Sequence, residues 1–303
     1  MQNYTIIEWM LFFYFYCFLG WCFESAYVSI KTHKLTNRGF IRGPFLPLYG
    51  SGATMMLAVS MPFQDNVFLV YLAGCVGATA LEFITGVTMV ALFDMRYCDY
   101  SNNKFNFKGH ICLKSTLMWG FCTIMMTEFM HVPVARVVRS FQTQPLRVFT
   151  ILLTVLIAVD FALSFKAAID LRDVLIKMAN TKAELVRIQR RLDVIIAFAG
   201  KSLGNRKDAL VESMDELKSG IEGKLESIKS LVFSKTDEYP DSMKEELMEL
   251  KTDYTVNVEM RSRLSRIRDF FQRDMIRSNP TMTSEHFKED LEELKQQVAS
   301  KKN

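Results

Sequence analysis

Five long apolar runs in the first 170 residues constrain the fold of this chain more than any other feature. A helix needs about 20 consecutive, mostly apolar residues to cross the hydrocarbon core of a bilayer. The sequence therefore predicts an all-α fold that begins with a polytopic membrane helix bundle of about five spans, some of them broken by Gly or Pro. The expected spans are Ile6–Val28, about Phe45–Phe63, Val67–Phe93, about Ile111–Met130 and about Leu146–Ile169.

Charged residues divide the chain near residue 170. Residues 1–170 hold 21 of them, whereas residues 171–303 hold 49, with 25 Lys and Arg against 24 Asp and Glu. From Leu171 onward, apolar residues recur three and four positions apart, which is typical of helices that pack in a coiled coil. We expect residues 1–170 to form a transmembrane helical domain and residues 171–303 a cytoplasmic coiled-coil-like helical domain that favours a homo-oligomer. The small net charge of this second part argues against nucleic-acid binding.

The distribution of Lys and Arg predicts the orientation of the spans, because cytoplasmic loops carry an excess of both. The loop Ser29–Gly43 carries four cations and no acid, and the loop Asp94–Gly109 carries three cations. We therefore expect a bacterial plasma-membrane (inner-membrane) protein with its N-terminus outside and its C-terminal domain in the cytoplasm. The segment Val132–Pro145 disagrees, since its two arginines would lie outside. Either it is an interfacial helix or one apolar run is re-entrant.

Two glutamates within the apolar runs are candidates for a functional site, because a carboxylate at bilayer depth costs at least a few kcal/mol. Glu24 lies near the cytoplasmic end of the first span, and Glu82 lies in the middle of the third. The Glu82 carboxylate could bind a cation, carry a proton, or form a buried ion pair with an arginine such as Arg38 or Arg42. Interfacial or packing roles are expected for three further polar residues: Glu128, His131 and Asp160.

Two loops combine glycine, proline, aromatic and polar residues. Four glycines and two prolines within Asn37–Gly52 forbid a regular helix, and irregular backbone at membrane depth needs cover from protein or access to water. Transporters often build binding sites from such broken helices. In the second loop, Asp99, Asn106 and His110 converge on a ligand or, as an equal alternative, cap the third and fourth spans. The candidate ligand or ion-path residues are Glu24, Arg38, Arg42, Tyr49, Glu82, Asp99, Asn106 and His110.

The same two loops carry a resemblance to a known family. The motifs NRGF, GP and PLYGSG within Asn37–Gly52, followed by LEFITG at Leu81–Gly86 and DYS at Asp99–Ser101, resemble the signature of the bacterial putative ABC-transporter type IV permeases. The resemblance covers about residues 15–122, and it departs from the family pattern at Cys98 and His110, where Trp and Arg are usual. The motif positions for which we expect structural roles are Trp21, Gly39, Gly43, Pro44, Pro47, Gly50, Gly52, Gly86, Gly109 and Trp119.

The resemblance implies the membrane subunit of a transporter. The sequence contains no Gly-x-x-x-x-Gly-Lys-Ser/Thr loop for binding ATP phosphates, so an ATPase would be a separate chain. It also contains no Cys-x-x-Cys pair and no Cys/His cluster at zinc spacing, so we expect no metal site and no cofactor. The expected partners are the lipid bilayer, a separate ATPase and further copies of the chain.

Three functions remain open at this point. The first is a transport or channel-type subunit whose path is lined by Glu24, Glu82 and the Gly/Pro-broken segment. The second is a non-catalytic sensor or scaffold, favoured by the large charged helical part, which would self-associate or recruit a partner. The third is an intramembrane lipid-processing enzyme built on the polar residues of the two loops. No catalytic motif supports this third function, so we assign no catalytic residue.

Overall fold

The computed structural model describes residues 4–97, 99–140, 144–198, 214–234, 241–267 and 269–300. Helices make up 81% of the described residues, and the named strands of this part form one short hairpin. The all-α prediction is therefore confirmed. Two compact units make up the chain: unit 1 comprises Met1–Arg172 and Arg268–Asn303, and unit 2 comprises Asp173–Ile267.

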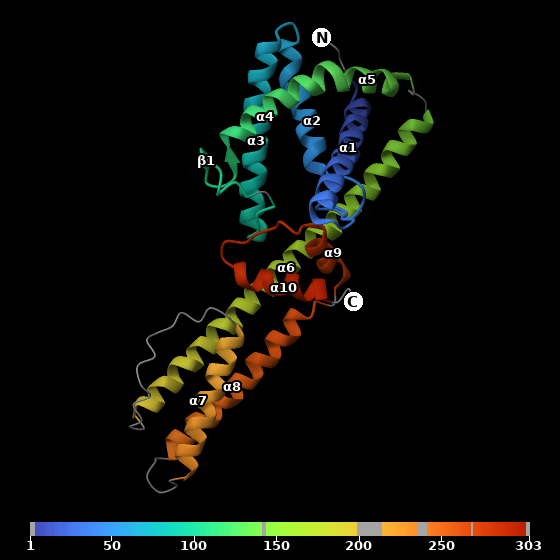
Figure 1. Ribbon diagram of the computed structural model, residues 1–303. Coiled ribbons are helices and arrows are strands. Elements are labelled where there is room, and N and C mark those ends of the chain that lie inside the picture. Colours follow the sequence, from blue (N-terminus) through green and yellow to red (C-terminus); the bar gives the residue numbers. More distant parts are fainter. Residues whose placement is uncertain are drawn as a thin grey trace. The chain divides into compact units, whose positions relative to one another are not determined.

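Unit 1 contains the apolar helices. Figure 1 shows that α1, α3 and the first part of α6 run in one direction, whereas α2 and α4 run in the opposite direction. In chain order its elements are α1 (Ile6–Thr32), α2 (Pro47–Ser60), the 3₁₀ turn η1 (Met61–Phe63), α3 (Val67–Phe93), strands β1 (Asn106–Phe107) and β2 (Ile111–Cys112), α4 (Leu113–Ile124), the π-helical turn η2 (Met125–Met130), α5 (His131–Ser140), the start of α6 (Gln144–Phe198), α9 (Phe270–Ser278) and α10 (Lys288–Ser300).

Local sequence signals set the ends of the two long helices α1 and α3. Thr5 caps α1 in a reciprocal arrangement: its hydroxyl accepts from the Glu8 amide, and the Glu8 carboxylate accepts from the Thr5 amide at 2.6 Å. Asn66 caps α3 by accepting from two amides of its first turn. Both helices end at a residue in the left-handed conformation, His33 (φ 53°) and Asp94 (φ 55°), which turns the chain out of the helix.

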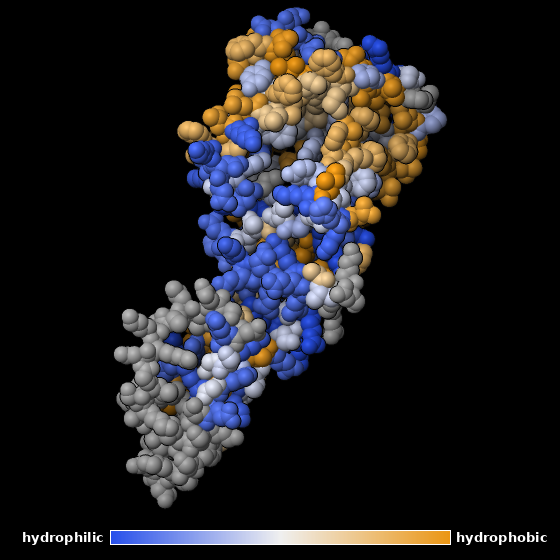
Figure 2. Space-filling view, viewed as in Figure 1, coloured by the Kyte–Doolittle hydropathy of each residue, from blue (hydrophilic) through white to orange (hydrophobic). Residues whose placement is uncertain are grey.

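Four helical segments are long and apolar enough to cross a membrane: Ile6–Thr32, Val67–Phe93, Leu113–Ser140 and Gln144–Ile195. Their apolar side chains face outward, as a lipid-facing surface requires. On α6 seven such residues are 54–67% exposed: Val148, Phe149, Ile151, Leu152, Val155, Leu156 and Val159. Figure 2 shows hydrophobic residues over these helices and hydrophilic residues around the end of unit 1 that holds the two loops.

The second predicted span forms a shorter helix than expected. α2 has 14 residues, which gives a length of about 21 Å, and η1 adds one further turn. This is less than the roughly 30 Å of a hydrocarbon core. Because α2 packs against both α1 and α3, its length is covered largely by protein. The count of about five spans stays a prediction.

Glycines allow the helices of unit 1 to approach closely. A Cβ atom on Gly50 of α2 would overlap the Cys17 Sγ of α1, and a Cβ on Gly120 of α4 would overlap the Cys75 Sγ of α3. Close backbone approach through small residues is the usual packing of membrane helices. Gly52 faces open space, with no atom within 4 Å of an added Cβ. Helix packing therefore does not require a glycine at this position.

α5 covers the end of unit 1 opposite the loops. Figure 1 shows it lying across the end of the bundle, near the start of α1. His131 and Ala135, one turn apart, are buried against that end, whereas Val137 on the other face is 56% exposed. Arg139 reaches back to Glu8, with 3.5 Å between Nε and Oε1. The interfacial and re-entrant alternatives for Val132–Pro145 both stay predictions, and residues 141–143 of this segment lie outside the described residues.

The C-terminal segment packs in unit 1, although the sequence grouped it with the charged second part of the chain; the two-domain division stays a prediction. Thr283 forms an antiparallel bridge with Arg96, with N···O distances of 2.7 and 2.9 Å between the two backbones. We call residues 278–286, which connect α9 to α10, the strap. Its neighbours α9 and α10 place the strap at the same end of unit 1 as the two loops (Figure 1).

Unit 2 is a bundle of three helices: the part of α6 after Asp173, α7 (Met214–Ser234) and α8 (Asp241–Ser265). Its buried core comprises Leu185, Ile188, Leu192, Ile195, Leu217, Ile221, Leu247 and Tyr254. The predicted three-four repeat thus faces other helices of the same chain. Self-association through a coiled coil stays a prediction.

Candidate functional site

Glu24, in the last third of α1, is held by an arginine and a tyrosine. The Tyr49 hydroxyl donates to Glu24 Oε2 at 2.9 Å, and Arg38 Nε lies 3.6 Å from Glu24 Oε1. Tyr49 reaches Glu24 because α2 begins beside this turn of α1, where a Cβ on Gly20 would overlap the Tyr49 ring. The Arg38 side chain is only 8% exposed, so its charge compensates Glu24 in a largely dry environment.

Arg38 also binds the strap. Its Nη1 donates to Asn279 Oδ1 at 2.8 Å and to the Ser278 carbonyl at 3.3 Å, and its Nη2 donates to Thr281 Oγ1 at 3.2 Å. Asn279, 1% exposed, returns a hydrogen bond from Nδ2 to the Gly39 carbonyl at 3.2 Å. Arg38 therefore joins α1, the first loop and the strap through one side chain.

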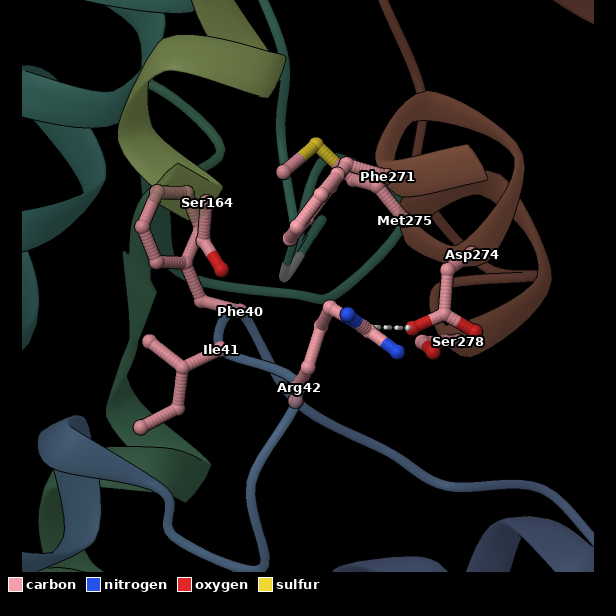
Figure 3. Close-up of a pocket in the computed structure, with 9 residues that line it drawn as sticks. Phe40, Ile41, Arg42, Ser164, Phe271, Asp274, Met275 and Ser278 are labelled. Atoms are coloured by element: carbon pink, nitrogen blue, oxygen red, sulfur yellow. Dashed lines mark ion pairs between the residues drawn. The ribbon is translucent and has the colours of Figure 1, made fainter. Parts of the chain in front are cut away.

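Arg42 and its neighbours line a small cavity between the first loop, α6 and α9 (Figure 3). Its Nε lies 3.4 Å from Asp274 Oδ2, and its guanidinium lies 4.4 and 4.8 Å from the ring centres of Phe270 and Phe271. The cavity measures about 10 Å³, enough for one water molecule at most. Ser164, whose buried Oγ has no partner among the described residues, lies on its wall. The site is too small for an organic ligand.

The irregular first loop is partly covered by protein, and several of its polar groups have partners on neighbouring helices. The Gly43 amide donates to Asp160 Oδ2 of α6 at 2.7 Å, and the Leu46 amide donates to the Cys17 carbonyl at 2.9 Å. Trp21 Nε1 donates to Asn37 Oδ1 at 2.5 Å. These contacts satisfy backbone groups that lipid would leave unpaired. Of the motif prolines, Pro47 starts α2 at its first helical position, while Pro44 is exposed.

Glu82 accepts three hydrogen bonds, all from neutral groups. Tyr100 Oη donates to Oε1 at 2.8 Å, and Ser115 Oγ and Trp119 Nε1 donate to Oε2 at 2.6 and 2.9 Å. No Lys, Arg or His of the described chain forms an ion pair with it. The ion pair that we considered between Glu82 and Arg38 or Arg42 is thus not formed, since those arginines bind Glu24 and Asp274.

Two of the three polar residues of the second loop, Asp99 and Asn106, order that loop through hydrogen bonds, and a ligand site there stays a prediction. Asn106 is the centre: its Nδ2 donates to the carbonyls of Ser101 and Asn103, and its Oδ1 accepts from the Gly109 amide at 3.1 Å. Gly109 needs its positive φ of 70°, and a Cβ there would lie 2.5 Å from Ser101 Oγ. The residues that cap the two helices are others: Asp94 ends α3, and Cys112 caps α4.

The charges around this loop shift two pKa values in the same direction. Burial alone would raise the pKa of Asp99, but hydrogen bonds from the Ser101 hydroxyl and amide, and the charge of Arg96, lower it below its ordinary value. Burial lowers the pKa of His110, and the positive charges of Arg96 and Lys108 lower it further. His110 lies against Gly86, where an added Cβ would lie 3.0 Å from Nδ1. Asp99 is therefore anionic and His110 neutral at physiological pH.

The helices α1 and α3 present their polar residues in equivalent positions. Both have 27 residues, and Cys17, Glu24 and Arg38 each have a counterpart of the same type 58 positions later: Cys75, Glu82 and Arg96. In both copies a glycine of the following helix faces the cysteine, and a hydroxyl near the start of that helix donates to the glutamate.

A second buried polar cluster, missed in the sequence, lies at the opposite end of unit 1. His131 is 6% exposed, and its two ring nitrogens bind the Tyr16 hydroxyl at 3.1 Å and the Tyr4 hydroxyl at 3.0 Å. Glu8, which is 4% exposed, binds Thr5 and Arg139. These contacts fix α5 on α1, so the packing role expected for His131 agrees with its position.

Comparison with known proteins gives one match. The family model described as "Putative ABC-transporter type IV" matches residues 11–165, just over half of the chain. No curated protein and no solved structure matches the chain. The matched range holds both glutamates and both loops, whereas the strap and unit 2 lie outside it.

Proposed function

The chain belongs to the putative ABC-transporter type IV family, and from this premise we propose that it is a membrane-embedded transport subunit with its polar site at Glu82. The contrast between Glu82 and Glu24 carries the proposal. The charge of Glu24 is compensated by Arg38, whereas among the residues that the structure describes Glu82 accepts hydrogen bonds from neutral donors only.

An uncompensated carboxylate in an apolar helix favours the binding of a cation or a proton. Glu82 is half-buried, and ionising a carboxylate in a partly apolar environment without a neighbouring counter-charge costs free energy that a bound cation or proton removes. The donors Tyr100, Ser115 and Trp119 orient both carboxylate oxygens. Parallel structural repeats with polar groups on their helices are also a common plan for transporters. Glu82 is therefore our candidate binding site for the transported or coupling ion.

Two finer features of the proposal rest on the sequence. The two loops at the Glu24 end carry seven of the twelve Lys and Arg of residues 1–170, so we place that end, the strap and unit 2 in the cytoplasm. Because the chain has no phosphate-binding loop, we assign ATP hydrolysis to a separate ATPase chain.

Ion flux through proteoliposomes tests the role of Glu82. The protein is purified with any bound ATPase, reconstituted, and assayed for proton and potassium flux with a membrane potential and with MgATP. We expect Glu82→Gln to reduce flux to the level of empty liposomes. Glu128→Gln, which changes an exposed acid of the same bundle, is the matched control and should behave as wild type. Wild-type flux in Glu82→Gln, or no flux in the wild type, would contradict the proposal.

A scaffold role is the second candidate, and unit 2 favours it. The three-helix bundle lies outside the family match and presents many charged side chains, including the Arg191–Glu246 and Lys224–Asp193 pairs. In that case Leu192→Asp with Leu217→Asp, which disrupts the bundle core, should abolish function while residues 6–172 still insert. Flux retained in this variant would assign the function to unit 1 alone.

A further inference from the structure

The hairpin between α3 and α4 presents two aromatic rings and two lysines at its tip. We call residues 104–108 the hairpin tip. Phe105 is 82% exposed and Phe107 is 55% exposed, and the exposed Lys104 and Lys108 flank them. A soluble surface rarely presents adjacent exposed phenylalanines unless they contact another surface.

The tip is held in this exposed conformation by the rest of the loop. Phe105 (φ 55°) and Lys108 (φ 51°) both have left-handed backbones, which are unfavourable for residues with large side chains. Asn106 between them is fixed by hydrogen bonds to the loop backbone, and the Phe105 carbonyl accepts from the Leu113 amide at 3.2 Å. An ordered loop therefore presents the two rings, and the hydrogen bonds within this loop offset the cost of its strained backbone.

The tip continues the lipid-facing surface of the membrane helices. Phe107 packs on Phe83 of α3 with 5.7 Å between ring centres. Near it along the two helices, Ile84 is 61% exposed, and Leu113 and Leu117 are each 49% exposed. About 25 Å of α3 separates Val67 from Phe83, close to the roughly 30 Å of a hydrocarbon core. The tip thus reaches headgroup level, and Glu82 lies at the adjacent edge of the core.

The segment from Tyr100 to Thr127 carries positive charges and no acid. Lys104, Lys108 and the exposed Lys114 lie within eleven residues, and the sequence has no acid between Asp99 and Glu128. Aromatic side chains favour the membrane interface, and clustered lysines next to a membrane attract anionic lipid. Charge and exposure therefore complement a bilayer surface rich in acidic phospholipid.

We propose that the hairpin tip is a binding site for anionic phospholipid headgroups. Phe105 and Phe107 lie in the interface, and Lys104, Lys108 and Lys114 bind lipid phosphates. The site depends on the membrane placement of α3 and α4 and not on transport, so loss of lipid binding and loss of flux are separate results.

Lipid retention measured by mass spectrometry tests the proposal. The full chain is purified in detergent, incubated with equal amounts of phosphatidylglycerol and phosphatidylcholine, and its bound lipids are counted. We expect a severalfold preference for phosphatidylglycerol that weakens at high salt. Changing Lys104, Lys108 and Lys114 to Gln should abolish this preference. The control variant changes the exposed Lys177, Lys251 and Lys288 to Gln, which alters the net charge by the same amount as the tip variant. This control should keep the preference for phosphatidylglycerol. Equal retention of both lipids, or an unchanged preference in the tip variant, would overturn the proposal.

The depth of the hairpin tip in the bilayer can also be measured, and this second test does not depend on a loss of lipid binding. Phe105→Trp adds one tryptophan to the three present, and the difference from wild type isolates its emission. In liposomes, lipids brominated near the headgroup should quench this emission, and aqueous iodide should have little effect. Strong quenching by iodide alone would place the tip in water and overturn the proposal.

Discussion

At the scale of single residues, Arg38 has more partners than any other side chain of the loop end that we have described. It compensates Glu24 and also binds the strap at Ser278, Asn279 and Thr281. Removing one partner of a buried ion pair leaves the other charge uncompensated, and the cost exceeds the net contribution of the pair.

We expect Arg38→Gln to destabilise the protein by about 2 kcal/mol or more, because Glu24 then lacks a counter-charge. The 27% exposure of the Glu24 side chain keeps the cost below that of a fully buried pair. Chemical unfolding in detergent measures the effect. Glu24→Gln with Arg38→Gln should recover part of the loss, and purely additive losses would show that the two side chains do not interact.

Gly50 and Gly52 offer a matched pair on one helix. Gly50→Ala should destabilise by about 1–3 kcal/mol, because the added Cβ overlaps Cys17 Sγ and approaches the Phe13 carbonyl. Gly52→Ala should be neutral or stabilise by up to about 1 kcal/mol, since nothing lies near it and alanine favours the helix. Thermal unfolding of both variants is the measurement, and equal effects would contradict the packing.

At the scale of elements, the strap binds both repeats. Arg38 of the first repeat holds Asn279, and Arg96 of the second donates from Nη2 to Glu285 Oε2 at 2.7 Å. His286 adds a contact to Asp94, with Nδ1 2.8 Å from Oδ1. The hydrogen bond and charge of Asp94 raise the pKa of His286 above its ordinary 6.5.

This raised pKa predicts a pH-dependent strap. A histidine with a higher pKa in the folded state stabilises fully below its unfolded pKa, near 6.5, and the contribution is lost as pH rises through the folded value. Wild type should therefore exceed His286→Gln in Tm at pH 6, and the difference should vanish well above the folded-state pKa. A Tm difference that is constant over this pH range would contradict a role for the imidazolium.

Helical elements were predictable because long apolar runs and capping residues are local signals. α1 and α3 begin and end within a few residues of the predicted spans. The strap was not predictable, because Arg96 meets Thr283 across 187 positions and neither residue carries a local signal for the other. The partners of Glu82 could not be predicted either, because the fold of the second loop brings Tyr100, Ser115 and Trp119 to its carboxylate.

At the scale of the whole molecule, the chain combines a membrane unit of known family with a helical unit outside the family match. Membrane insertion follows from four long apolar helices with outward-facing apolar side chains. The proposed transport function rests on Glu82, which has no charged partner among the described residues, and it predicts an ATPase as a partner.

The composition of the complex that the chain forms in its native membrane tests the proposed transport function most directly. The tagged chain is purified from its native membranes in mild detergent, and co-purifying proteins are quantified by mass spectrometry alongside ATP hydrolysis. We predict an ATPase with a phosphate-binding loop at near-stoichiometric amounts, with hydrolysis that depends on the presence of the chain. A chain that purifies without an ATPase, as a defined oligomer with no associated hydrolysis, would contradict the assignment as an ABC-type transport subunit.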